Sequence, residues 1–310
     1  MDCFDQRVLA ELAERDRRLI TRAEVFGLGG TEAHIDRRLM TGRWQLVYDG
    51  VYLVGVGRLT WEEDVLAAVL ASGPTAIASI RAAIVLWGLD GVARAPVEIT
   101  VVHSTEAVIR GVVHRSRRLE PICWVSGVPT TSVERTLLES GQVVPPIVTE
   151  KAFTSAWRQH LTSPAKCLMY LEHHGGKGRT GVRRLREIAA SYADGHRPPG
   201  SAAETDFFRL LAPALADFQL PPPIRQYEVR LGDGTVAVVD AAWPDRRKVV
   251  EVEGLQFHGN ARATDYDIYR RTMLRRAGWD VHQVGAYALR HRPTQAIQHV
   301  LDFLGGFAGA

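Results

Sequence analysis

The chain has 310 residues, of which 46% are hydrophobic and 24% are charged, and its formal net charge is +3. These values are ordinary for a soluble globular protein of two or three domains, and the mildly basic balance permits a nucleic-acid partner without requiring one. No apolar run approaches the roughly 18 residues of a membrane span, and no signal peptide is expected. Cys3, Cys123 and Cys167 lie far apart and form no CxxC pair. We therefore expect a cytoplasmic protein with reduced cysteines and no membrane segment.

The first 57 residues predict three short helices followed by a β-hairpin. Apolar residues recur with a helical period between Asp5 and Glu14, and Thr21 and Thr31 are residue types that begin helices. Asp49-Gly50 separates two β-rich runs, which is a strong hairpin signal. This order is the outline of a winged helix-turn-helix, in which one helix enters the major groove of DNA.

A winged helix-turn-helix would place the helix over residues 31–41 against DNA. The basic side chains expected to meet phosphates or base edges are Arg37, Arg38 and Arg43. The alternative is a helical pair with a solvated basic face, because small helix–hairpin units also serve as docking modules for proteins.

Several short motifs in this region are similar to those of a known family. The motifs are Ile20-Thr21-Arg22-Ala23-Glu24, Arg37-Arg38-Leu39, Gly42-Arg43-Trp44 and Gly50-Val51-Tyr52. They resemble the N-terminal domain of the AbiEi-type antitoxins. That resemblance implies a winged helix that binds operator DNA, and a cognate nucleotidyltransferase-like toxin as a second partner.

Residues 58–195 predict a mixed α/β region. The expected helices cover residues 61–71 and 75–87, and the expected strands cover residues 97–102 and 111–116, with more helices from Ser132 onward. The segments that resemble the same antitoxin family are Leu86-Trp87-Gly88-Leu89, Val113-His114-Arg115-Ser116 and the run from Thr130 to Leu138. No catalytic constellation is predicted in this region.

Residues 200–310 follow a linker rich in proline and glycine and predict a third domain. Ser201 is a candidate helix cap, and Glu204 stands three residues later, which is the spacing of a capping box. The pattern then predicts strands over residues 224–231, 235–242 and 248–253, a helix over 264–277, a strand over 280–284 and a helix over 294–304. The expected fold class is α/β in the broad sense (α+β), with an αβββαβα core at its C-terminal end.

Acidic residues interrupt the apolar strands of this third domain. Asp240 ends one strand, and Glu251 and Glu253 lie two residues apart on the next, which directs both side chains to one face. A buried carboxylate is costly unless it is paired or binds a metal, and a divalent cation relieves repulsion between neighbouring acids. The alternative is structural: Glu204 as a cap partner, Glu253 as an exposed turn acid and His258 as a core histidine.

The order of the elements and the acids resembles the restriction-endonuclease-like, or PD-(D/E)xK, nucleases. A closer resemblance is to relatives of the very-short-patch-repair endonucleases. It rests on Asp240-Ala241-Ala242-Trp243, the run from Glu251 to His258, Asp267-Ile268-Tyr269-Arg270-Arg271 and Ala277-Gly278-Trp279. Glu253 departs from both patterns, because it stands where related enzymes have a lysine or a histidine.

The resemblance implies a metal-dependent hydrolysis of phosphodiester bonds. The residues with an implied catalytic role are Asp240, Glu251, Glu253, His258 and Glu204. Asp240 and Glu251 would hold Mg²⁺ or Mn²⁺, and His258 would deprotonate or orient the attacking water. Arg270 and Arg271 would contact the phosphate, or pair with Asp267.

Two functional hypotheses follow. In the first, the protein is a magnesium-dependent DNA endonuclease with an N-terminal DNA-reading domain. In the second, it is an antitoxin-like autorepressor whose nuclease fold is inactive. The absent lysine favours the second hypothesis, whereas charges retained in an apolar strand favour the first. The sequence leaves the oligomeric state open.

Overall fold

The computed structural model describes residues 3–14, 17–102, 109–176, 180–192, 199–253 and 261–305, with only the backbone at residues 3, 13 and 261–267. These residues form thirteen α-helices, one short 3₁₀ helix and three sheets, which confirms the predicted mixed α/β class. The chain divides into two compact units: Met1–Ala152 with Met169–Leu185, and Phe153–Leu168 with Arg186–Ala310. Among the described residues, no helix is both long and apolar enough to cross a membrane.

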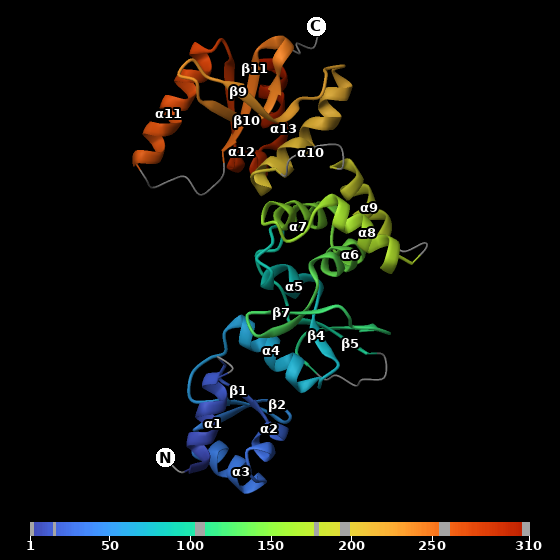
Figure 1. Cartoon of the computed structure of the whole chain (residues 1–310), viewed down its shortest axis with the longest axis vertical. Helices are drawn as coiled ribbons and strands as arrows, with labels where there is room; N and C mark the ends of the chain where they lie inside the picture. Colours follow the sequence, from blue (N-terminus) through green and yellow to red (C-terminus); the bar gives the residue numbers. More distant parts are fainter. Residues whose placement is uncertain are drawn as a thin grey trace. The chain divides into compact units, whose positions relative to one another are not determined.

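The first unit begins with three helices and a three-stranded antiparallel sheet (Figure 1). In chain order these are α1 (Cys3–Glu14), β1 (Leu19–Thr21), α2 (Arg22–Gly27), α3 (Glu32–Met40), β2 (Trp44–Tyr48) and β3 (Val51–Val54). The helices and the hairpin are the predicted ones, and β1 is an addition that pairs with β3. Thr21 begins α2 with a full capping box. The Thr21 hydroxyl accepts from the Glu24 N–H, and the Glu24 carboxylate accepts from the Thr21 N–H.

Apolar side chains cover both faces of this small sheet. Ile20 and Tyr52 pack on the helix side with Ile35 of α3. Leu19 and Leu53 pack on the other side, in a core that also contains residues of the helix α4 (Trp61–Ala71). The boundary predicted at residue 57 therefore lies between elements that share a core.

A five-stranded sheet follows, in the order β6-β5-β4-β8-β7. Its elements are β4 (Ala76–Ala78), α5 (Ile80–Leu86), β5 (Glu98–Val102), β6 (Val112–Ser116), β7 (Ile122–Val125) and β8 (Val128–Thr131). The helix predicted over residues 75–87 is wrong in its first part, because residues 76–78 form a buried strand paired with β5. The next helices are α6 (Val133–Val143), α7 (Pro146–Arg158), α8 (Pro164–His174) and α9 (Thr180–Ser191).

The second unit contains a four-stranded sheet in the order β12-β11-β10-β9, in which only the β11–β12 pair is parallel. Its elements are α10 (Ala202–Asp217), β9 (Ile224–Arg230), β10 (Val236–Trp243), η1 (Pro244–Arg246), β11 (Lys248–Glu253), α11 (Ala261–Arg276), β12 (Asp280–Gly285), α12 (Ala286–His291) and α13 (Pro293–Leu304). This is the predicted order with the short helix α12 added.

Helices cover both faces of the four-stranded sheet (Figure 1). Helices α10, α12 and α13 pack on one face, where Ala241, Val250 and Val252 lie in the core. Helix α11 packs on the other face, against Val239 and Val249. Val239 and Ala241 thus face opposite cores although they lie two residues apart on β10. The usual strand alternation is therefore interrupted at Asp240, between them.

Candidate functional site

Three carboxylates from three elements of the second unit are buried or partly buried. Glu204 lies in the first turn of α10 and is only 4% exposed, and Glu251 of β11 is 8% exposed. Asp240, near the end of β10, is partly buried. Because buried carboxylates are costly, the contacts of each one decide what the site can do.

Glu204 and Asp240 share one hydrogen-bond donor, the side-chain amide of Gln226 on β9. Its Nε2 donates to Glu204 Oε2 at 2.8 Å and to Asp240 Oδ1 at 3.2 Å. Two backbone groups complete the set: Gly200 N–H donates to Glu204 Oε2 at 2.9 Å, and Val252 N–H donates to Asp240 Oδ2 at 2.8 Å. The acid of α10 and the acid of β10 therefore converge on a single nitrogen atom.

Glu251 has a different partner. The Arg270 guanidinium, from α11, donates to Glu251 Oε1 and to the Val238 carbonyl. Arg271 donates to Gln283 Oε1 at 2.8 Å. Both arginines that were predicted to contact phosphate thus bond within the protein, and Arg270 places a positive charge beside Glu251.

The three acids titrate abnormally because they are buried. Burial, followed by the charge of Asp240, raises the pKa of Glu204 to about 7. Burial also raises the pKa of Asp240, and it raises the pKa of Glu251 although Arg270 opposes that shift. The Asp240 charge contributes to the raised pKa of Glu251 as well. Burial thus disfavours the ionised form of all three acids, and added positive charge would stabilise that form.

The donor set suits a hard divalent cation, which takes carboxylate oxygens as ligands. Glu204 and Asp240 converge on one point, as two ligands of a single ion do. No group of three or more His, Cys, Asp or Glu side chains stands ready to hold a metal within the described ranges. In the arrangement observed, Gln226 lies between two of the acids, and Glu251 bonds to Arg270.

The remaining predicted residues of the C-terminal site are placed as follows. Glu253 ends β11 with an exposed side chain, although it lies only two residues from buried Glu251. His258 lies outside the described residues. The Lys248 ammonium donates to the Phe303 carbonyl and lies over the Phe303 ring.

Sequence reasoning missed two members of the cluster. Gln226 lies opposite Asp240, because its neighbours pair with the neighbours of Asp240, so the register of this hairpin is the signal that could have identified it. Arg158, at the end of α7, has no such signal. It donates to the Pro199 carbonyl at 2.8 Å, and its charge lowers the pKa of Glu204 against the larger effect of burial.

The predicted DNA-contacting arginines differ in their surroundings. Arg38 is 3% exposed, and its Nε donates to Asp5 Oδ1 at 2.8 Å while its guanidinium lies 4.7 Å from the Phe4 ring centre. It joins α3 to α1 inside the protein. Arg37 is exposed in the last turn of α3, and the Arg43 side chain is 67% exposed. Arg37 and Arg43 are therefore the two with side chains on the surface.

Comparison with known proteins gives relatives but no activity. No protein-family model matches the sequence. Two proteins of Mycobacterium tuberculosis, from strains CDC 1551 / Oshkosh and ATCC 25618 / H37Rv, are 28% identical to it over 128 residues, and both are described as uncharacterized. The similarity covers 41% of this chain and 45% of each relative, so the chain spans less than half the length of these relatives.

Proposed function

We propose that this protein binds DNA and hydrolyses its phosphodiester bonds at the acid cluster of the second unit, with Mg²⁺ or Mn²⁺ as cofactor. The observation that carries the proposal is the excess of buried carboxylate at Glu204, Asp240 and Glu251. Groups with strongly perturbed pKa values cluster at functional sites, because catalytic acids and bases need pKa values matched to their task. The resemblance to very-short-patch-repair endonucleases and the cytoplasmic location expected from the sequence belong to the same proposal.

In this mechanism, Glu204 and Asp240 would hold the cation, which would supply an activated water and stabilise charge on the phosphate when bound. Arg270 provides the fixed positive charge that related enzymes obtain from the lysine absent at Glu253, because it already bonds to Glu251. His258 remains the predicted residue for positioning the attacking water. Arg37 and Arg43 hold the DNA backbone.

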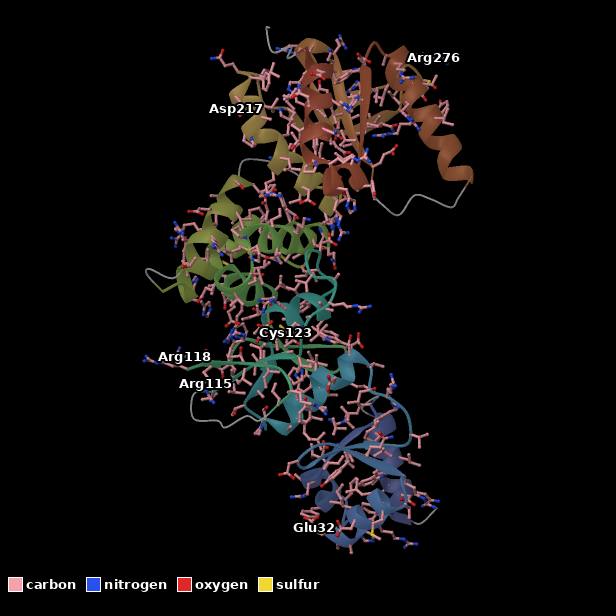
Figure 2. The ribbon with its side chains drawn as sticks, turned by 180° about the vertical axis from the view of Figure 1, so that it is seen from behind. Glu32, Arg115, Arg118, Cys123, Asp217 and Arg276 are labelled. Atoms are coloured by element: carbon pink, nitrogen blue, oxygen red, sulfur yellow. The ribbon has the colours of Figure 1, made fainter. Side chains whose placement is uncertain are left out.

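The test is cleavage of supercoiled plasmid, mismatched duplex and single-stranded DNA by the full chain with Mg²⁺ or Mn²⁺. Asp240→Asn should lower the rate about a thousandfold, because metal-assisted catalysis supplies several kcal/mol and each 1.4 kcal/mol is a factor of ten. Asp217→Asn is the matched control, since Asp217 is exposed at the C-terminal end of α10 (Figure 2). Equal cleavage by the Asp240→Asn protein and the wild type would show that the activity is a contaminant.

A second candidate function is an antitoxin-like repressor that binds DNA and a nucleotidyltransferase-like toxin. It is favoured by the absent lysine at Glu253 and by the partners that the acids already have inside the protein. Salt-dependent DNA binding that is unchanged in Asp240→Asn, together with no cleavage by the wild type under any cation, would favour this alternative.

A further inference from the structure

The backbone of Gln226 is strained where the carboxamide meets the acids. The φ angle of Gln226 is 48°, in the left-handed region that favours glycine, although the residue lies inside strand β9. The ladder between β9 and β10 is regular on both sides, pairing Arg225 with Ala241 and Tyr227 with Val239. Gln226 thus stands opposite Asp240, where the alternation of β10 is also interrupted. Strain of this kind persists only where the surrounding structure imposes it.

The strained backbone directs the Gln226 nitrogen between two carboxylates from different elements. A side-chain amide nitrogen carries two hydrogens, and here the two acceptors are Glu204 Oε2 and Asp240 Oδ1. These oxygens lie 2.8 and 3.2 Å from Nε2. Carboxylate oxygens are ligands that Mg²⁺ prefers, so these two oxygens would hold a divalent cation in place of the nitrogen.

We propose that the Gln226 carboxamide is a placeholder for the cation. In the cation-free protein its nitrogen donates hydrogen bonds to both Glu204 and Asp240, and an entering divalent cation would displace it from the same two oxygens. This inference rests on the proposed metal-dependent function, and it assigns to Gln226 a positioning role without a part in the chemistry. It follows that Gln226 lowers the affinity for the cation while it stabilises the cation-free site.

Gln226→Gly is the first test, because glycine adopts a positive φ without strain and removes the carboxamide. The whole 310-residue chain would be titrated with MnCl₂. Electron paramagnetic resonance would give the concentration of free Mn²⁺, and the Tm would be measured with and without EDTA. We expect Mn²⁺ to bind about tenfold more tightly, because the competing charged hydrogen bonds are lost. The Mn²⁺-induced rise in Tm should also exceed that of the wild type.

Gln226→Met supplies a second variant that keeps the side-chain length and lacks both the donor and the acceptor. The matched control is Gln298→Met, because Gln298 on α13 donates to Asp302 Oδ1 at 2.8 Å on an exposed surface. The control should bind Mn²⁺ as the wild type does.

Two negative results are distinct. If the wild type binds Mn²⁺ and neither Gln226 variant binds it more tightly, the placeholder role is overturned and the proposed function stands. If neither the wild type nor either Gln226 variant binds Mn²⁺ at a site sensitive to Asp240→Asn, the metal-dependent function and the placeholder role both fail.

Discussion

Each unit of the protein buries carboxylate, and the two clusters differ in how that charge is balanced. In the first unit the fully buried Glu98 accepts from His114 Nε2 at 2.7 Å, from Arg81 Nη1 at 3.1 Å and from the Arg81 backbone N–H at 2.9 Å. In the second unit three acids share one bonded guanidinium, two backbone N–H groups and one neutral amide.

The contrast separates a fully paired structural acid from acids whose burial is only partly compensated. Glu98 holds β5, β6 and the start of α5 together, and each of its oxygens has a short-range donor. Glu204, Asp240 and Glu251 have raised pKa values because burial outweighs the donors that surround them. Burial alone therefore does not distinguish the two clusters; the balance between burial and the surrounding donors does.

Glu98→Ala should have the largest effect on stability. It leaves the Arg81 guanidinium and the His114 ring without their shared acceptor, and loss of one partner from a buried ion pair costs about 3 to 5 kcal/mol. Urea unfolding followed by circular dichroism measures it. Glu62→Ala, at an exposed acid of α4, is the control and should change stability by less than about 0.5 kcal/mol. A small loss in Glu98→Ala would remove the basis for calling this cluster structural.

Glu204→Gln should raise the folding stability at neutral and higher pH, whereas Glu98→Ala should lower it. The pKa of Glu204 is raised from 4.5 to about 7, so between those pH values the folded state binds more protons than the unfolded state. Stability then falls as the pH rises through that window, and glutamine removes this dependence. In cation-free buffer above pH 7 the variant should be more stable by about 3 kcal/mol. The measurement is a urea titration at several pH values, with Asp217→Asn keeping the wild-type slope. A retained slope in Glu204→Gln would contradict the contrast between the clusters.

The smallest expected effect concerns the arginines of α3, one of which is exposed and the other buried. Arg37→Ala should leave the Tm unchanged and should reduce the slope of log affinity for DNA against log salt by about one, because one phosphate contact is lost. Arg38→Met is the matched comparison. It should lower the Tm instead, since it removes a buried partner of Asp5. Fluorescence anisotropy with labelled duplex DNA gives both slopes, and an unchanged slope in Arg37→Ala would exclude Arg37 from the interface.

Local signals in the sequence predicted much of the fold. Asp49-Gly50 marked the hairpin correctly, and Thr21 and Ser201 marked the starts of α2 and α10. The residues Ala76–Ala78 were misassigned to a helix because alanine favours helices, whereas the pairing partner that makes them a strand lies more than twenty residues away on β5. A pattern of neighbouring residues does not reveal a strand-pairing partner so far away in the chain.

Glu251 and Glu253, predicted to point to one face, differ in burial for a related reason. Residues two apart on a strand point to one face, but burial also depends on what covers that face. Arg270 of α11 meets Glu251, whereas Glu253 at the end of β11 is exposed. The same reasoning applies to Arg37 and Arg38, which have the same charge and differ in exposure because only Arg38 faces Asp5 of α1.

The sequence alone determined the class of fold, most of the order of the elements and the identity of Glu204, Asp240 and Glu251 as candidate acids. Those conclusions depend on periodicity, caps and turns, which act over a few residues. Only the tertiary structure decided which groups meet: Glu204 with Asp240 through Gln226, and Glu251 with Arg270. These pairings depend on how helices pack on the sheet, because hydrogen bonds form at about 3 Å between side chains far apart in the chain.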